Sequence, residues 1–152
     1  MSHEARLAAL GLTLPTPPKP VATYATIVQH GDLVYTSGHG PLRPDGGFVV
    51  GKLGATLDVA AGREAARLTG LAILASLRAH LGSLDRVTRI VKVLGIVNAT
   101  PEFAMHPLVI NGFSDLMVEV FGDAAIAARS AVGTNSLPAG IAVEIEAIIA
   151  VA

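Results

Sequence analysis

Residues 57–98 read LDVAAGREAARLTGLAILASLRAHLGSLDRVTRIVKVLGIVN, and this stretch decides the fold class. Small and apolar residues recur in its first part at steps of three and four positions, which predicts a helix over 57–81; they are Ala61, Ala65, Leu68, Ala72 and Ala75. Asp58 lies at the start of this helix, and Gly82, just past its end, suits the C-terminal cap.

The second part of the stretch, Asp85 to Asn98, alternates between two rows of side chains. Alternation with a period of two predicts a strand, here a long one, with a bulge or bend near Gly95. A long helix that leads directly into a long strand is typical of a sheet with helices packed on it. The fold class is therefore α+β.

The flanking segments add further elements to this unit. Upstream, Thr26–Gln29 and Leu33–Ser37 predict a strand pair joined by a turn at 30–32, and Phe48–Val50 predicts a third short strand. Downstream, a second helix is expected to begin at Thr100-Pro101-Glu102, to kink or restart at Pro107 and to end at Phe121. The strands Arg129–Asn135 and Ala142–Val151 follow, which predicts a mixed six-stranded sheet with two helices on one face.

The last strand indicates what covers the other face of the sheet. One row of its side chains is apolar throughout and suits packing under the helices: Val143, Ile145, Ala147, Ile149 and Val151. The opposite row is mostly apolar but contains the carboxylates of Glu144 and Glu146. We expect a neighbouring subunit to cover this row and to leave the carboxylates at a cleft.

Composition favours the same interpretation. The chain has 152 residues, the size of one domain, with residues 1–19 as an N-terminal extension and 20–152 as the folded unit. Hydrophobic residues make up 51% and charged residues only 15%, and the mean hydropathy is +0.57. The longest apolar run, Leu68–Leu77, is half of the roughly 20 residues that a membrane span needs. Burial between subunits accounts better for the hydropathy.

Charge and residue types narrow the function. A net charge of −1 gives no reason to expect nucleic acid as a partner. The chain has no cysteine, which excludes disulfides and a thiol nucleophile and fits a cytoplasmic location. Its five histidines show no metal-site spacing, so we expect neither a metal nor a cofactor. Residues 1–10 have none of the features of a signal peptide.

Four motifs occur in an order that resembles the RidA/YjgF/UK114 family, also named the endoribonuclease L-PSP family. They are Ser37-Gly38 after a strand, Ala128-Arg129-Ser130, Leu137-Pro138 and Val143-Glu144-Ile145-Glu146-Ala147. The resemblance covers roughly residues 20–152. It implies a chorismate mutase-like fold, a homotrimer whose sheets form a central barrel, and a site between adjacent subunits.

The resemblance also implies an activity, the hydrolysis of 2-aminoacrylate-type 2-imino acids to 2-keto acids and ammonia. Arg129 matches the arginine that binds the substrate carboxylate, for which a guanidinium offers a planar fork of donors. Glu144 matches the acid that positions the attacking water and moves protons, and Glu146 is expected to be structural. The alternatives are an ordinary surface ion pair for Arg129 and, for Glu144, a solvated carboxylate or a pairing with Arg129 that only holds the trimer together.

Three further residues match positions that bind substrate in the family. Tyr24 matches a tyrosine of the pocket, Gly38 a glycine whose main chain contacts the ligand, and Asn111 an asparagine before the second helix. Tyr24 and Asn111 serve equally well as structural polar groups. His39 stands where many members have glutamine, and we expect it to be a surface histidine in a loop. The extension 1–19 is longer than in compact members and is expected to cover part of the cleft.

Two other functions remain open. In the first, the protein is not an enzyme and uses the same pocket to bind a keto acid or a related metabolite. The departure from the family's glutamine at His39 favours this alternative. RNA cleavage is the second, and the near-neutral charge and the 4% aromatic content argue against it. The resemblance leaves the substrate side chain and the pathway undetermined.

Overall fold

A computed structural model describes all residues from 1 to 152. The first long helix, α2 (Val59–Leu81), is the one expected over 57–81. The Asp58 carboxylate accepts a hydrogen bond of 2.8 Å from the Ala61 N–H, and Gly82 ends the helix at a φ of 82°, which favours glycine. Both caps predicted for this helix are confirmed.

The sheet has five strands, so the expected sixth strand is wrong. Its order is β1 (Ile27–His30), β2 (Leu33–Thr36), β5 (Val143–Val151), β3 (Val87–Asn98) and β4 (Ala128–Thr134). The β3–β4 pair is parallel and the others are antiparallel, which confirms a mixed sheet.

The segment expected to form the sixth strand, Phe48–Val50, makes only isolated bridges, from Phe48 to Leu42 and from Val50 to Ile141. It lies between Gly46 and Gly51, which have φ angles of 92° and 136°. The chain turns away from the extended conformation at these two glycines, so Phe48–Val50 forms no ladder beyond the single bridges.

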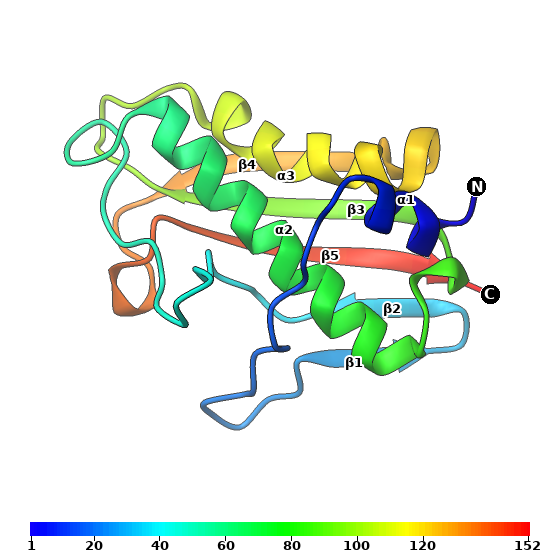
Figure 1. The fold of residues 1–152 in the computed structure, drawn as a ribbon. Coiled ribbons are helices and arrows are strands. Elements are labelled where there is room, and N and C mark those ends of the chain that lie inside the picture. Colours follow the sequence, from blue (N-terminus) through cyan, green and yellow to red (C-terminus); the bar gives the residue numbers. More distant parts are fainter.

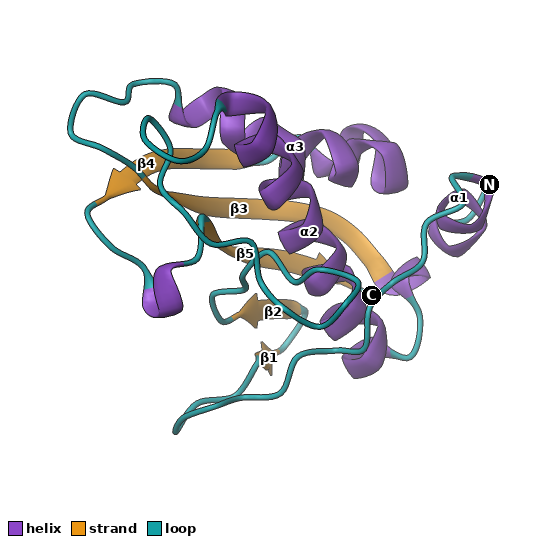
Figure 2. Cartoon of the chain, turned by 60° about the vertical axis from the view of Figure 1, so that its left-hand side comes forward, coloured by secondary structure: helices purple, strands orange, loops and turns teal.

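The molecule has two layers, with α2 and α3 (His106–Phe121) on one face of the sheet (Figures 1 and 2). The expected inner row of β5, from Val143 to Val151, is buried beneath these helices. The two helices touch main chain to main chain, since a Cβ on Gly112 would lie 2.0 Å from the Arg63 carbonyl oxygen. Glycine at this position therefore allows the close approach of α2 and α3.

The second helix begins later than predicted. Pro101 and Glu102, which follow Thr100, form a turn, and α3 starts at His106 with Pro107 in its first turn. Proline suits that position because the N–H that it lacks would have no partner there. The bulges of β3 lie between Val87 and Lys92 rather than near Gly95. Gly95 has another role: a Cβ there would lie 2.7 Å from the Ile110 side chain of α3.

The opposite face of the sheet has no layer over it in this chain. We call it the open face. The strand registers place these apolar side chains on it, together with Glu144 and Glu146: Val28, Tyr35, Leu94, Ile96, Val132 and Ile148. Val28, Tyr35 and Val132 are exposed in the single chain.

The N-terminal extension is firmly attached at its start. Helix α1 (His3–Ala9) buries Leu7 in the core. The Glu4 carboxylate accepts a hydrogen bond of 2.9 Å from the Leu84 N–H and pairs with Arg78 at 3.3 Å. Residues 10–21, which we call the strap, then cross over α2 from the side of α3 to the side of β1 (Figure 1). None of the helices combines the length and apolar character required to span a membrane.

Candidate functional site

A pocket of about 210 Å³ opens where the end of the strap meets the sheet. Tyr24, Gly38 and Glu144, three of the predicted site residues, line it. Its walls are largely apolar, and the strap forms one of them; the lining includes Leu42, Phe48 and Ile141 and, from the strap, Pro18, Lys19 and Val21.

Glu144 lies directly on the main chain of Gly38. A Cβ at residue 38 would be 2.8 Å from the Glu144 Cδ and 2.9 Å from its Cγ, so only glycine leaves room for this side chain. Partial burial raises the pKa of Glu144 above its usual range, and repulsion from Glu146 adds to the effect. The carboxyl group therefore keeps its proton to a higher pH than an exposed glutamate.

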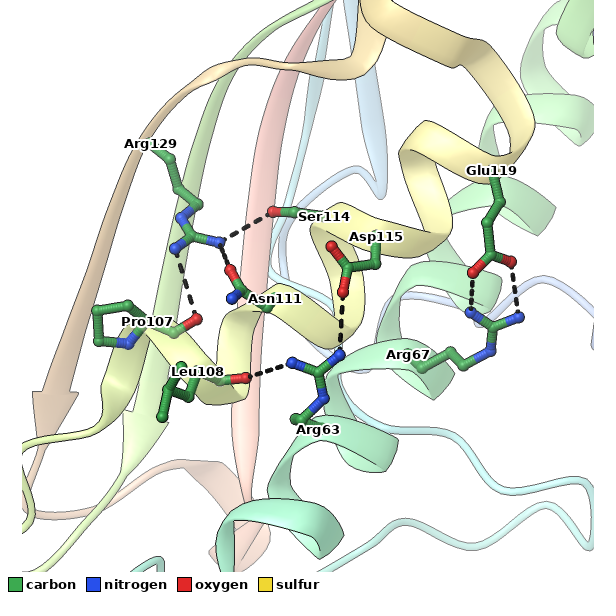
Figure 3. A network of polar contacts seen from close by, with 9 residues as sticks. All are labelled: Arg63, Arg67, Pro107, Leu108, Asn111, Ser114, Asp115, Glu119 and Arg129. Carbon is green, nitrogen blue, oxygen red and sulfur yellow. Dashed lines mark hydrogen bonds and ion pairs between the residues drawn. The ribbon is translucent and has the colours of Figure 1, made fainter.

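Arg129 is held by helix α3, and all of its partners are neutral (Figure 3). Its Nη1 donates to the Asn111 side-chain oxygen at 2.9 Å and to the Ser114 hydroxyl at 3.1 Å, and its Nη2 donates to the Pro107 carbonyl at 3.5 Å. No carboxylate lies within 4.0 Å of its guanidinium in the chain. Its charge is thus oriented but not neutralised.

Two arginines of α2, which Figure 3 also shows, form ordinary ion pairs with carboxylates. Arg63 pairs with Asp115 at 2.9 Å, and Arg67 makes a two-pronged pair with Glu119 at 3.0 and 3.2 Å (Figure 3). Both pairs link α2 to α3 on the surface of the helical layer. Within a single chain, Arg129 therefore does not form the surface ion pair that was the alternative for it.

Arg129 and Glu144 lie on opposite faces of the sheet. Val93 pairs with Arg129 on one side and with the buried Ala147 on the other, so all three side chains point toward the helices. Glu144 is three positions from Ala147 on β5 and points to the open face. Within one chain the structure groups Arg129 with Asn111, and Glu144 with Tyr24 and Gly38, but it does not bring the two groups together.

The expectation that His39 is a surface loop residue is wrong. His39 lines the pocket, and the residue is only 3% exposed. The imidazole contacts the Ser76 hydroxyl of α2 at 2.9 Å. Its burial is decided by a contact with α2, 37 positions further along the chain.

Sequence reasoning also missed two serines. Ser114 follows Asn111 by three positions on α3, a spacing that places both side chains on one face of a helix. That spacing was a usable signal once α3 was expected and Arg129 was chosen. Ser76 carried no such signal, because it lies in a run of apolar residues that predicts only a buried helix face.

The fold is one mixed sheet with two long helices on one face and a small pocket at one end of its strands. This arrangement places the chain in the YjgF/chorismate mutase-like class of folds. The family model described as "YjgF/chorismate_mutase-like, putative endoribonuclease" matches residues 4–143, and the chain belongs to this family. The match begins within α1 and includes the strap.

The chain is also similar in sequence and structure to individual proteins. Protein TCP17 of Trypanosoma cruzi is 42% identical over 146 residues, which cover 95% of this chain and 91% of that protein. The crystal structure of Atu1372 from Agrobacterium tumefaciens, of unknown function, is 41% identical, with a TM-score of 0.91 over 99% of this chain and 92% of that one. TdcF of E. coli, solved with bound serine, is 25% identical, with a TM-score of 0.65 over 90% of this chain and 94% of that one.

Proposed function

We propose that this protein hydrolyses 2-imino acids, and their enamine tautomers of the 2-aminoacrylate type, to 2-keto acids and ammonia. The observation that carries the proposal is the Arg129 guanidinium, which is oriented by Asn111, Ser114 and Pro107 and has no carboxylate partner. A guanidinium fixed in this way is prepared to bind a ligand carboxylate through two parallel hydrogen bonds. A cytoplasmic location is part of this proposal.

The proposal requires a second copy of the chain. Because Arg129 and Glu144 lie on opposite faces of one sheet, a ligand that contacts both must lie between two subunits. The apolar open face gives those subunits a surface to bury, since Val28, Tyr35 and Val132 are exposed in the single chain. We propose a homotrimer in which the open faces form a central barrel and each site has Arg129 from one copy and Glu144 from the next.

Hydrolysis of an imine needs one group that first accepts and then donates a proton. As water attacks the C=N carbon, the ionised Glu144 carboxylate accepts a proton from it. The resulting acid returns this proton to the nitrogen, which gives a tetrahedral carbinolamine. The carboxylate then accepts the proton of the carbinolamine hydroxyl and passes it to the nitrogen, so that the C–N bond breaks and ammonia leaves as the C=O bond forms. A carboxyl group with a raised pKa serves both steps near neutral pH. An enamine enters the same route once its terminal carbon is protonated.

The size and lining of the pocket fit this class of ligand. A volume of about 210 Å³ suits a small metabolite, and apolar walls suit a short side chain. TdcF was crystallised with serine, a ligand of comparable size with one carboxylate. Tyr24 and Gly38 line the pocket beside Glu144 and are proposed to contact the ligand. Asn111 acts on it through Arg129.

The activity is tested with imines that an amino-acid oxidase generates in the reaction mixture, in competition with semicarbazide as a trap. An active protein lowers the rate of semicarbazone formation and raises the rate of ammonia release. The Arg129→Met variant is expected to lose about 100-fold in kcat/KM because the carboxylate contact is gone. Arg67→Met, which removes an arginine paired with Glu119, is the matched control and is expected to keep full activity.

A mixing experiment tests whether the site is shared between copies. Arg129→Met and Glu144→Gln are each expected to be inactive. In trimers assembled from equal amounts of both, about a quarter of the interfaces contain both native residues. Recovery of activity near that fraction supports a shared site, and a mixture as inactive as its components rejects it.

The two alternative functions give results that differ from imine hydrolysis. Saturable binding of 2-ketobutyrate without faster imine decay establishes a keto-acid-binding protein instead of an enzyme. RNA cleavage that persists through further purification and disappears in Arg129→Met establishes the endoribonuclease activity that the family description names.

A further inference from the structure

His39 joins three parts of the molecule beneath the pocket. Its main chain pairs with Ile145 of β5 through bonds of 2.9 and 3.0 Å in the two directions. Its ring Nδ1 lies 2.8 Å from the Ser37 carbonyl oxygen, and its Nε2 lies 2.9 Å from the Ser76 hydroxyl of α2. Both ring nitrogens therefore have a partner.

These partners determine the protonation of the ring. A carbonyl oxygen only accepts hydrogen bonds, so Nδ1 has the proton and donates it to Ser37. Nε2 of the neutral ring is then an acceptor, and the Ser76 hydroxyl donates to it. Burial lowers the pKa of His39, which favours this neutral form.

The segment held in this way is the one on which Glu144 lies. The N–H groups of Ser37 and His39 donate to Thr26 and Ile145 at 2.9 Å each, whereas the N–H of Gly38 between them has no acceptor in the chain. Gly38 therefore offers a free donor at the pocket, next to the Glu144 carboxyl group that packs on it. The relative position of these two groups depends on how firmly residues 37–39 are held.

We propose that His39 and Ser76 are positioning residues of this site: their hydrogen bond ties residues 37–39 to helix α2 and so fixes the Gly38 N–H and the Glu144 carboxyl group relative to each other. Ser76 is suited to this task because it lies within α2, a helix of 23 residues and the longest element of the fold. Ala72, one turn earlier on the same face of α2, lines the pocket itself. The catalytic part of this inference rests on the proposed function, whereas the positioning part does not.

The first test uses Ser76→Ala and needs no activity. Without the serine, residues 37–39 loosen and water reaches Glu144, so its pKa, followed by carbon NMR of the labelled carboxyl group, is expected to fall toward the ordinary glutamate value. Thr69→Val is the matched control, because Thr69 is also a buried hydroxyl of α2 but donates to its own helix at Ala65 and does not line the pocket. The control is expected to leave the Glu144 titration unchanged. An unchanged titration in Ser76→Ala overturns the proposal.

The second test asks whether the chemistry of the hydrogen bonds is what matters. Glutamine at position 39 has a donor for Ser37 and an acceptor for Ser76, whereas leucine has neither. We expect His39→Leu and Ser76→Ala to lower kcat about tenfold with little change in KM, and His39→Gln to restore most of it. If His39→Gln is as impaired as His39→Leu while both remain folded by circular dichroism, the positioning role is wrong.

The two proposals fail in different ways. If the wild-type protein hydrolyses no imine, the proposed function fails, while the NMR titration of Glu144 in Ser76→Ala still decides the positioning role. If the wild type is active and Ser76→Ala matches it in both titration and kinetics, the proposed function stands and only the positioning role is rejected.

Discussion

Gly38 and Glu144 are packed so closely that the Cβ of any other residue at position 38 would lie within 2.8 Å of the Glu144 carboxyl carbon. The contact joins a loop after β2 to the start of β5, two segments more than 100 positions apart in the chain. It places a main-chain group and an acid with a raised pKa at the same point of one pocket.

Gly38→Ala is expected to displace Glu144 rather than to unfold the protein. The atoms in the way belong to a flexible side chain, which swings aside at little cost, so the melting temperature is expected to fall by only a few degrees. Imine hydrolysis is expected to fall by about 10- to 100-fold because the acid moves from its place. Gly47→Ala is the control, since its Cβ would also meet the end of a flexible side chain, that of Arg43, but outside the pocket. Equal activity of Gly38→Ala and the wild type would contradict the placement of the site.

Glu146→Gln is expected to lower the pKa of Glu144. Repulsion from Glu146 is the second cause of the raised pKa, after burial, so its removal brings the titration part of the way back. The rising limb of the pH–rate profile, which reports the ionised base, is expected to move to lower pH. Carbon NMR of the Glu144 carboxyl group and kcat/KM against pH are the two measurements. A limb that stays in place would show that Glu144 is not the base.

The raised pKa of Glu144 also predicts how stability varies with pH. An acid that binds its proton more tightly in the folded state favours folding when protonated, and this contribution is lost as the pH rises from the usual value of 4.5 through the raised one. Glutamine at position 144 does not titrate, so the Glu144→Gln variant does not lose stability in this way as the pH rises. Its stability relative to the wild type, measured by urea unfolding, is therefore expected to be greater at pH 7 than at pH 4. A difference that does not depend on pH would contradict the burial of the carboxylate.

Gly112→Ala is expected to destabilise the helical layer. Its Cβ would lie 2.0 Å from a main-chain oxygen of Arg63, which cannot rotate away, so α2 and α3 must move apart. Overpacking of this kind costs about 1–3 kcal/mol. Glu119→Ala, which breaks the partly exposed Arg67–Glu119 pair between the same helices, is expected to cost less than about 1 kcal/mol. The order of the two unfolding free energies is the test, and the reverse order would contradict the packing described.

The strap is expected to loosen when its anchor is removed. Glu4 accepts a hydrogen bond from the Leu84 N–H and pairs with Arg78, so Glu4→Ala leaves α1 with fewer ties to the fold. Prolines 15, 17, 18 and 20 have no N–H to donate, and packing alone holds the strap beside the pocket. Limited chymotrypsin cleavage of the strap after Leu12 is expected to be faster in this variant, while hydrogen exchange in β3 stays unchanged. Cleavage at the wild-type rate would show that the strap is held independently of α1.

Local chemistry made much of the fold predictable. The helix over 59–81, its caps, the first strand pair and the inner row of β5 all depend on residues that are neighbours in the chain, and they were predicted correctly. The family was also identified from short motifs, and the match over residues 4–143 confirms it. The start of α3 was wrong because Pro101 and Glu102 form a turn before the helix, and the sixth strand was wrong because Phe48–Val50 makes only isolated bridges between two glycines with positive φ angles.

The sequence by itself determined which side chains are present for chemistry: a guanidinium at 129, a carboxyl group at 144 and no side chain at 38. Only the tertiary structure decided that His39 is buried against Ser76, that the strap walls the pocket, and that Arg129 and Glu144 lie on opposite faces of the sheet. The reason is physical. Periodicity and capping arise from residues a few positions apart, whereas burial and the face to which a side chain points are set by strands and helices that pair across the whole chain.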